Sequence, residues 1–371
     1  MNNTYIWQQK NWQSFSYDLK ELKKLEEQFL HYSGISIGAQ KVLSSEEKEE
    51  IKILLLSEEA INTAKIEGEF LNRESLQSSI KEYLQLKDPI SKNYPQENGM
   101  AKMMVDLYLN FQTPLTQEML FSWHQMTMNG RTDLESIGAY RSHEEPMQII
   151  SNKMSGVEVH YEAPPSKNVK NEMDKFINWF NSSEKKLPSL IRAGIAHVYF
   201  EIIHPFEDGN GRIGRALIEK SLAQSLKQPT FIAVSQVIQN NKKEYYQGIS
   251  KVNTSNEITD WLRYFCKTIL EAQKYTTNSI EFLIKKTQFF DKNAAQLNDR
   301  QTKLVKRIFK ENLQEFTGGI SVKNYISITK ISPITANRDL NDLVAKNIMK
   351  RTGKLKTTRY WLQFDPQMLF T

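Results

Sequence analysis

Helical periodicity dominates this chain of 371 residues. Apolar residues recur three and four positions apart over long stretches, which is typical of amphipathic helices. Ser44 and Glu47 precede the first long stretch in the manner of a capping box, and Gly68 follows it where a helix would end. We therefore expect a mainly α fold, with helices at 45–68, 100–111, 116–128, 168–181, 190–203 and 212–226.

Two short β-prone segments interrupt the helices. They are Gln148–Ser151 and Val157–Tyr161, and the five-residue loop between them contains Gly156. Such segments on either side of a short loop with glycine predict a β-hairpin. A little upstream, Gly138–Arg141 has the composition of a turn that leads into a strand.

The last part of the chain has a different order of elements. From residue 285 the pattern predicts helices at 298–311, 321–330 and 333–346, then strands at 348–351 and 359–362. This order is typical of a winged helix-turn-helix. Dimerisation and substrate capture are alternatives to DNA binding for such a domain. The side chains suited to phosphate and base contacts are Thr335, Asn337, Arg338, Asn341, Lys354, Lys356 and Arg359.

Charge is distributed unevenly along the chain. Residues 301–371 carry 13 Lys and Arg against 5 Asp and Glu, whereas the first 300 residues carry 36 against 38. A basic module joined to a nearly neutral body favours an acidic partner for that module.

The remaining composition excludes several classes of protein. With 39% hydrophobic and 25% charged residues, the chain is ordinary for a soluble globular protein. It has no run of about 18 apolar residues, so we expect no membrane span. Its first residues lack the basic and apolar regions of a secretory signal. The single cysteine, Cys266, excludes an intrachain disulfide. Together these features predict a cytoplasmic protein.

The segment His204–Arg215 carries most of the chemistry; it reads His-Pro-Phe-Glu-Asp-Gly-Asn-Gly-Arg-Ile-Gly-Arg. Gly209 and Gly211 allow the backbone to approach a phosphate closely. The helical composition that follows indicates that this turn opens a helix, whose N-terminus attracts anions. Arg212 and Arg215 lie three positions apart, roughly on one helix face, where both can hold phosphates.

Other residues of this segment suit metal and proton chemistry. Asp208 offers a hard oxygen ligand for Mg²⁺. His204 is expected to be largely neutral near pH 7 and can take a proton from a hydroxyl. Asn210 can add an amide contact. Each feature alone is also typical of a structural histidine or an ordinary helix start, but their combination indicates a nucleotide site beside a base.

This segment resembles the signature of the Fic family, His-Pro-Phe-x-Asp/Glu-Gly-Asn-Gly-Arg-x-x-Arg, and matches it at every fixed position. The resemblance implies transfer of AMP from ATP to a protein hydroxyl, with release of pyrophosphate. It also implies that His204 is the base and that Asp208 holds Mg²⁺. A phosphotransferring branch of the family has lysine at the position of Gly211, which favours nucleotidyl transfer here. The residues implied to grip the phosphates are Asn210, Gly211, Arg212 and Arg215.

An upstream segment, Thr63–Gly68, resembles the inhibitory motif of the same family, Ser/Thr-x-x-x-Glu-Gly/Asn. The resemblance implies that Glu67 pairs with Arg215 and blocks the productive position of the ATP γ-phosphate. A carboxylate and a phosphate also compete for one guanidinium on physical grounds. In some family members this glutamate positions a water that removes AMP. The alternative is an ordinary Thr and Glu one helical turn apart.

The resemblance assigns further roles to the hairpin and to two tyrosines. The hairpin resembles the family's flap, so a target segment would add as a strand beside His204. Tyr245 and Tyr246 would border the adenine pocket. The alternatives are a surface hairpin without function and tyrosines that pack a helix. The expected docking residues of the flap are Ile149, Ile150, Val157 and Val159.

The sequence thus predicts a helical N-terminal domain (1–98), a Fic core (99–277) and a winged helix (285–371). The opening of the first domain resembles an uncharacterised domain that often accompanies Fic cores. The first hypothesis is an auto-inhibited protein adenylyltransferase that uses ATP and Mg²⁺. It modifies a Ser, Thr or Tyr hydroxyl of a target protein or of itself, and forms a homodimer. The alternative is a nucleotide-sensing, DNA-binding transcriptional regulator without transferase activity.

Overall fold

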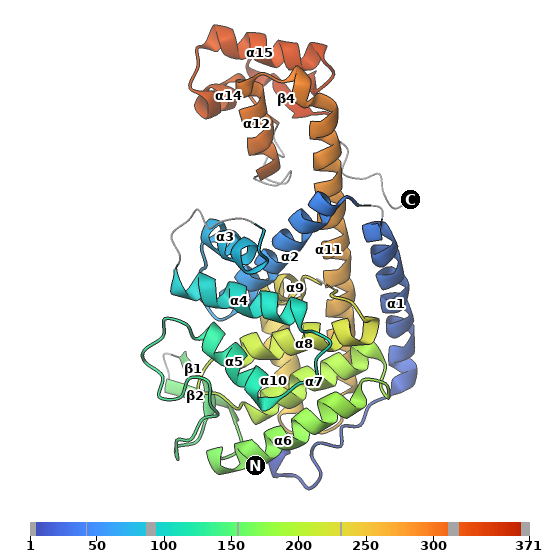
Figure 1. Ribbon diagram of the computed structural model, residues 1–371, viewed down its shortest axis with the longest axis vertical. Coiled ribbons are helices and arrows are strands. Elements are labelled where there is room, and N and C mark those ends of the chain that lie inside the picture. The colour runs from blue at the N-terminus through green and yellow to red at the C-terminus, as the bar shows by residue number, and fades with distance from the viewer. Residues whose placement is uncertain are drawn as a thin grey trace. The chain divides into compact units, whose positions relative to one another are not determined.

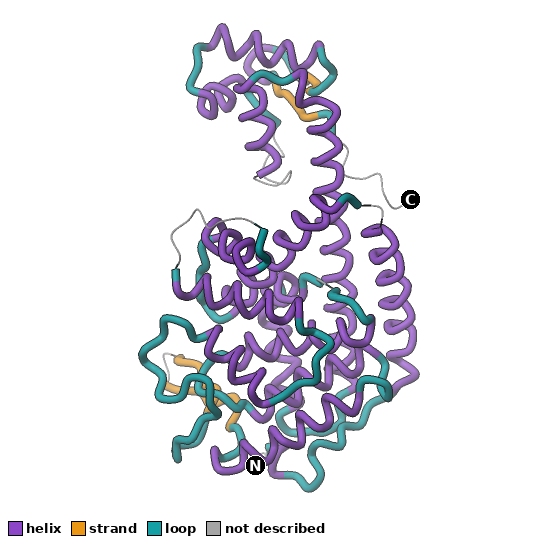
Figure 2. The backbone as a smooth tube through the Cα atoms, viewed as in Figure 1, coloured by secondary structure: helices purple, strands orange, loops and turns teal. Residues whose placement is uncertain are grey.

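The computed structural model describes residues 5–41, 43–86, 94–153, 156–230, 232–310 and 319–364. The chain divides into two compact units, residues 1–277 and 278–371, each with its own hydrophobic core. Most of the described residues are helical, and each unit has one two-stranded sheet (Figure 2). The fold is therefore mainly α, as the sequence predicts. None of the described helices is both long and apolar enough to cross a membrane.

The helices that the sequence predicts in unit 1 are all present (Figure 1). The helix expected at 100–111 begins earlier, because Pro95 opens it at a first-turn position that favours proline. In order, the elements are η1 (Ile6–Gln8), α1 (Leu19–Lys41), α2 (Ser45–Ile66), α3 (Arg73–Tyr83), α4 (Pro95–Leu109), α5 (Gln117–Thr127), β1 (Gln148–Lys153), β2 (Gly156–Glu162), α6 (Ser166–Ser183), α7 (Ser189–Ile203), α8 (Asn210–Leu226), α9 (Val234–Asn240), α10 (Lys242–Val252) and α11 (Thr259–Asn293), which ends in unit 2.

Helix α7 is the central helix of unit 1, and all of its residues are buried. A buried helix start would leave backbone N–H groups unpaired. Glu26 of α1 prevents this, because its carboxylate accepts the N–H groups of Ser189 and Leu190 at 2.7 and 2.8 Å. The helix that leads to His204 is thus fixed at its far end by a charged cap.

Arg192 of α7 joins three helices from inside the core. Its fully buried guanidinium donates to the carbonyl oxygen of Phe180 in α6 at 2.9 Å. It also donates to the carbonyl of Ser221 at 3.1 Å and to Gln224 Oε1 at 2.8 Å, both in α8. Burial lowers the pKa of Arg192 to about 10, so the group stays charged at neutral pH. One buried side chain thus links α6, α7 and α8.

Helix α2 begins and ends as its sequence predicts. The Glu47 N–H donates to Ser44 Oγ at 3.2 Å, and the Ser44 N–H donates to Glu47 Oε2 at 2.8 Å, which completes the capping box. Gly68 follows the helix at φ +84°, a left-handed conformation that favours glycine. In the second half of α2, the Glu59 carboxylate accepts the backbone N–H of Ser235 in α9 at 3.1 Å and also its hydroxyl. The end of α2 therefore has a fixed place.

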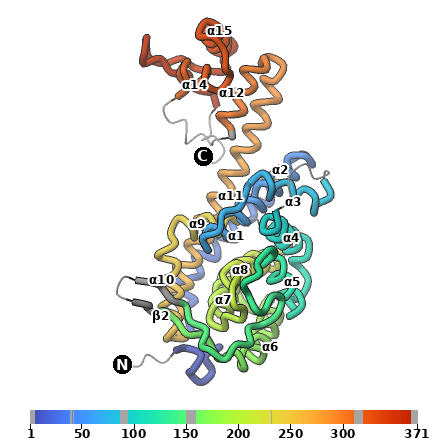
Figure 3. The backbone as a smooth tube through the Cα atoms, turned by 90° about the vertical axis from the view of Figure 1, so that its left-hand side faces the viewer, coloured from blue at the N-terminus to red at the C-terminus, as the bar shows by residue number. Residues whose placement is uncertain are grey.

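Strands β1 and β2 form the expected hairpin, with Ile149 opposite Tyr161 and an irregularity in register directly after Ile149. The buried Tyr161 anchors the hairpin, because its hydroxyl donates to the carbonyl of Ile202 in α7 at 2.8 Å. Figure 3 shows β2 at the edge of unit 1. Residues 154–155 of its turn lie outside the described part of the chain.

Residues 138–141 form a turn without the strand that the sequence pattern predicts. Arg141 explains the difference, because it is buried and its guanidinium takes up backbone carbonyls rather than facing a strand partner. It donates to His204 O at 2.8 Å, to Pro164 O at 2.5 Å and to Ile203 O at 3.3 Å. Arg141 thus fixes this segment against the end of α7.

Unit 2 contains the helices and the hairpin that the sequence predicts, but its assignment as a winged helix-turn-helix stays a prediction. Its core is organised around Asp339, which accepts Arg300 Nε at 2.7 Å and the Tyr325 hydroxyl at 3.0 Å. The elements are η2 (Ala294–Gln296), α12 (Asp299–Lys310), α14 (Val322–Thr329), α15 (Pro333–Ala345), β3 (Met349–Thr352), η3 (Leu355–Thr357) and β4 (Arg359–Leu362).

Replacement of Arg192 by methionine tests its role in unit 1. The substitution keeps most of the side-chain volume but removes the hydrogen bonds of the guanidinium to the carbonyls of Phe180 and Ser221 and to Gln224. We expect Arg192→Met to lower the free energy of unfolding by about 3 kcal/mol, measured by calorimetry. The control is Lys175→Met on the exposed face of α6. A change for Arg192→Met as small as that of the control would contradict this role.

Candidate active site

His204 lies where α7 ends, in a conformation that few side chains adopt. Its φ and ψ are 50° and 62°, and its N–H donates to the carbonyl of Phe200 at 3.0 Å. Only 13% of the side chain is exposed, and its Nδ1 is wholly buried. The exposed part of the ring therefore lies away from Nδ1. Burial, reinforced by the positive charge of Arg141, lowers the pKa of His204 to about 4. The imidazole is neutral at pH 7 and can accept a proton.

The loop between α7 and α8 is braced by side chains on both sides. Asn210 accepts the Phe206 N–H at 3.0 Å and donates to the Phe206 carbonyl at 2.8 Å. Phe206 stacks on His124 with ring centroids 4.1 Å apart. His124 Nε2 lies 3.2 Å from the carbonyl oxygen of Asp208, while its Nδ1 accepts the N–H of Gly138 at 2.9 Å. The Asn210 amide thus fixes the loop, and its predicted contact with a phosphate stays a prediction.

Helix α8 starts at the turn that the sequence predicts. Gly209 precedes the helix at φ +82°, and Asn210 and Gly211 form the start of its first turn. Arg212 and Arg215 are 1% and 2% exposed. The positive end of the helix and two buried guanidinium groups therefore lie together near His204, which makes a strong site for an anion.

Arg215 is held by the end of α2. Its Nε donates to Thr63 Oγ1 at 2.7 Å, and its Nη2 donates to Glu67 Oε1 at 2.7 Å and to the carbonyl of Thr63 at 3.0 Å. A Cβ at Gly211 would lie 2.4 Å from Glu67 Oε1 and 2.9 Å from Arg215 Nη1. The glycine therefore leaves room for the ion pair. The structure places Glu67 against Arg215, across 148 residues of sequence.

Asp208 and Arg212 belong to a ring of four charged groups. Asp208 accepts Arg131 Nη1 at 2.8 Å and Arg212 Nη2 at 3.2 Å, while Glu69 accepts Arg212 Nη1 at 2.6 Å and lies 3.9 Å from Arg131. Burial opposes ionisation of Asp208, but Arg212 and Arg131 together hold its pKa below the ordinary value. The carboxylate is therefore ionised at neutral pH. The Asp208 side chain is 37% exposed.

Arg131, Glu69 and His124 were missed in the sequence analysis. Glu69 follows Glu67 by two positions, and that proximity to the inhibitory motif was a usable signal. His124 lies in α5 and Arg131 follows that helix. Both are far from Asp208 in the sequence, and no spacing connects them to it. Only the fold brings these three side chains to the motif.

Asp208 suits a cation that a phosphate ligand completes. Among the described residues, no three His, Cys, Asp or Glu side chains form a metal cluster. Mg²⁺ is often bound by one or two carboxylates together with substrate phosphates, so a single ionised carboxylate beside an anion site fits that ion.

The remaining candidate residues lie in different surroundings. Tyr245 is buried, with its hydroxyl 2.7 Å from His197 Nε2, whereas Tyr246 is 43% exposed and stacks 5.8 Å from Lys242 Nζ. Tyr245 is thus a core residue, and Tyr246 alone is open to a ligand. On the hairpin, Ile149 packs partly against the core and Val159 is 41% exposed. The side chains of Ile150 and Val157 lie outside the described part.

Two family models match the chain. Residues 114–222 match the Fic/DOC family, and residues 5–86 match a domain of unknown function, DUF4172. The second match agrees with the uncharacterised N-terminal domain expected from the sequence. The first covers the loop, α7 and most of α8, which carry the site.

Curated relatives match over short segments. A probable protein adenylyltransferase of Aquifex aeolicus is 38% identical over 65 residues, which is 18% of this chain and 20% of the relative. A protein adenylyltransferase of Caenorhabditis elegans is 29% identical over 100 residues, which is 27% of this chain and 18% of the relative. The match thus spans a fifth or less of these relatives.

Solved structures share the fold. A Fic family protein from Desulfovibrio desulfuricans has a TM-score of 0.52 and 21% identity, over 91% of this chain and 96% of the other. A Fic domain containing signaling protein from Bacteroides thetaiotaomicron has a TM-score of 0.51 and 18% identity, over 70% of this chain and 96% of the other.

The ring of charges around Asp208 predicts the effect of removing Arg131. In Arg131→Gln one of the two cations is lost, so we expect the pKa of Asp208 to rise toward its ordinary value. The measurement is a ¹³C NMR titration of the Asp208 carboxyl. Arg263→Gln, which removes a half-buried arginine of α11 paired with Glu21, is the control. An Asp208 titration that is the same in both variants would show that Arg131 has no influence.

Proposed function

The chain is a Fic family protein, and from this premise we propose that it transfers AMP from ATP to a hydroxyl of a target protein, under restraint by Glu67. One observation carries the proposal. The neutral, buried His204 lies near the N-terminus of α8, together with the buried Arg212 and Arg215. The second arginine is paired with the carboxylate of Glu67. A base next to an occupied anion site suits phosphate chemistry with a built-in restraint.

The anion site would hold the triphosphate. The N-terminal N–H groups of α8, with Arg212 and Arg215, supply donors for the phosphate oxygens. Arg212 Nε is buried and has no hydrogen-bond partner among the described residues, so one donor of this site awaits an acceptor. Asp208 would hold Mg²⁺, which neutralises phosphate charge when bound. Tyr246 is the tyrosine open enough to border the adenine.

His204 would act on the target hydroxyl. Because its pKa lies near 4, the imidazole is neutral at pH 7, and in the form whose Nε2 carries the lone pair it can take the hydroxyl proton as the oxygen attacks the α-phosphorus. The preformed positive environment stabilises the charge that develops on the phosphate, without reorganisation during the reaction. The hairpin β1–β2 would align the target backbone by strand addition.

Glu67 would restrain the site by occupying Arg215. A nucleotide phosphate that binds Arg215 must displace the Glu67 carboxylate, which already has a short, partly buried contact with this guanidinium. Thr63 strengthens the restraint, because its hydroxyl and carbonyl occupy two further donor positions of the same guanidinium. Glu67 would also orient a water for removal of AMP, as the resemblance implies for some relatives.

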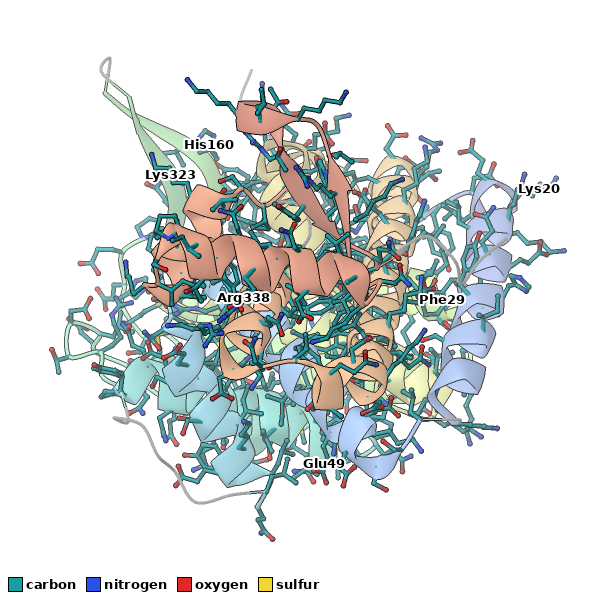
Figure 4. All side chains as sticks on the ribbon, turned by 90° about the horizontal axis from the view of Figure 1, so that it is seen from above. Lys20, Phe29, Glu49, His160, Lys323 and Arg338 are labelled. Atoms are coloured by element: carbon teal, nitrogen blue, oxygen red, sulfur yellow. The ribbon has the colours of Figure 1, made fainter. Side chains whose placement is uncertain are left out.

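A second candidate function concerns unit 2, which we propose binds DNA as a winged helix. On α15, Ile334 is 84% exposed and Arg338 lies on the same open surface, where Figure 4 labels it. Leu355, between two exposed lysines in the loop before β4, is 93% exposed. Exposed apolar side chains among cations suit thymine methyl contacts and insertion between bases. Asn337 donates to the carbonyl of Pro333, so Arg338 and Asn341 are the better candidates for base contacts.

Loss of Glu67 tests the enzymatic proposal. We expect Glu67→Gly to raise transfer of label from α-labelled ATP to protein by at least about tenfold, because Arg215 is freed for phosphate. Lys65→Gly, at an exposed position in the last turn of the same helix, is the matched control and should behave as wild type. Adding His204→Ala to Glu67→Gly should abolish the transfer. Equal labelling of all these proteins would refute both assignments.

The DNA proposal is tested on the full chain by fluorescence anisotropy with a pool of duplexes. Arg338→Ala should weaken binding to a preferred sequence by about 1–3 kcal/mol. Lys354→Ala should weaken binding to all sequences and reduce the salt dependence by about one phosphate contact. The absence of any binding at about 50 mM salt would exclude this function.

A further inference from the structure

A buried acid lies directly behind His204. Glu201 precedes it by one turn of α7, is 8% exposed, and places its Oε2 3.8 Å from His204 Nδ1. Among the described residues, neither His204 Nδ1 nor Glu201 Oε1 has a hydrogen-bond partner. Leaving a buried polar atom unpaired costs about 1–3 kcal/mol, so such atoms in a native fold call for a functional explanation.

Helix α8 is shaped to leave room for this acid. A Cβ at Gly214 would lie 2.5 Å from Glu201 Oε1 and 3.1 Å from His197 Nδ1. Any residue other than glycine would push the carboxyl group away from its place between the two helices. His197, one turn before Glu201 in α7, is fixed by its contact with the Tyr245 hydroxyl. The Glu201 carboxyl group thus lies beside the His204 ring in a space that Gly214 keeps open.

We propose that Glu201 is the positioning residue of His204, and that its carboxylate selects the form of the imidazole that acts as a base. When Glu201 is ionised, it accepts a hydrogen bond from Nδ1–H, and the lone pair lies on Nε2. When Glu201 is protonated, it donates to Nδ1, and the ring proton moves to Nε2, which can then accept nothing. The charge of Glu201 therefore decides whether His204 is competent.

This inference rests on the proposed function. In the transfer step itself, Glu201 forms no covalent bond and exchanges no proton. The hydroxyl proton of the target passes to Nε2 of His204. The hydroxyl oxygen forms a bond to the α-phosphorus, and the bond from that phosphorus to the bridging oxygen breaks. Pyrophosphate leaves with the bonding electrons. The imidazolium that results then has the carboxylate of Glu201 beside Nδ1, in the manner of the acid of a Ser-His-Asp triad.

The charges around the pair determine the pH at which it changes. Burial raises the pKa of Glu201 to about 8, with Arg215 of α8 opposing the rise and Glu67 reinforcing it. His197 has its pKa lowered to about 3 by burial and is neutral.

The other groups near the pair are neutral or act on His204. Tyr245 and Tyr246 of α10 have their pKa raised by burial, so both are uncharged at neutral pH. Arg141 and Asp208 act on His204 itself. Glu201 is therefore protonated below about pH 8 and ionised above it, and His204 should gain base competence as the pH rises through that value.

The main-chain carbonyl of Glu201 offers a rival account, because it also favours a proton on the His204 ring. Substitution of the side chain separates the two. Glu201→Gln keeps the shape and the carbonyl but removes the titrating charge, whereas Glu201→Asp keeps the charge. Glu219→Gln, which removes a carboxylate that accepts the Thr230 N–H elsewhere on α8, is the control.

The test is ¹⁵N NMR of labelled histidine in the nucleotide-free full chain, with the His204 signal identified by its loss in His204→Ala. We expect the Nδ1–H form to replace the Nε2–H form between about pH 7 and 9 in wild type, in Glu219→Gln and in Glu201→Asp. The change should be absent in Glu201→Gln. If the His204 signal depends on pH in the same way in Glu201→Gln and wild type, the proposal is overturned.

A kinetic arm uses the Glu67→Gly background. There, kcat should rise with pH through the ionisation of Glu201, and Glu201→Gln should remove that rise and lower kcat at least about tenfold, with little change in KM for ATP. Retention of the pH-dependent rise in Glu201→Gln would contradict the proposal. If Glu67→Gly transfers no AMP at all, the proposed function fails, and the NMR result still decides the role of Glu201.

Discussion

A buried guanidinium must have an anion, and the arrangement of this active site follows from that requirement at Arg215. The side chain is almost fully enclosed between α2 and α8, where an unpaired charge would be strongly destabilising. In this structure Glu67 and Thr63 satisfy it. The phosphates of a nucleotide have the charge and the geometry to replace them. One cation thus connects the folding of the N-terminal helices to the chemistry at His204.

The surrounding fold keeps that choice of partner open. Gly211 and Gly214, on successive turns of α8, remove the side chains that would collide with the Glu67–Arg215 pair and with the Glu201 carboxyl group. Helix α2 brings Glu67 to the site at a fixed position, because Glu59 ties the helix to α9. At the other end of the site, Arg141 donates hydrogen bonds to the backbone carbonyls at the end of α7. The base and its anion site therefore rest on rigid supports, and the inhibitory contact lies at the end of a helix, where displacement disturbs the least structure.

The sequence predicts well what is encoded over short distances. The twelve residues from His204 carry the base, the carboxylate and both arginines, so the chemistry is legible without a structure. The capping box of α2 and the hairpin were legible for the same reason, since turns and caps depend on neighbouring residues. The pairing of Glu67 with Arg215 was accessible only through the resemblance to a family, because no periodicity spans 148 residues.

Contacts that depend on tertiary packing were not predictable. His124 of α5 and Arg131, which follows that helix, reach the site from far away in the sequence, and nothing in their own stretch of sequence marks either of them. The Asn210 amide suits a ligand contact, but in the structure it pairs with the N–H and the carbonyl of Phe206, because both groups are buried in the tight loop before α8. In such cases the competing demand is satisfaction of buried polar atoms, which becomes visible only when the neighbours in space are known.

The central claim is that Glu67 and ATP compete for Arg215, and a double-mutant cycle of ATP affinity tests it most directly. The dissociation constant would be measured by calorimetry for wild type, Glu67→Gln, Arg215→Gln and the double variant. The account predicts that Glu67→Gln tightens ATP binding at least about tenfold when Arg215 is present and changes it by less than about twofold when Arg215 is replaced. The same tightening in both backgrounds would show that Glu67 acts on ATP without Arg215 and would contradict the account.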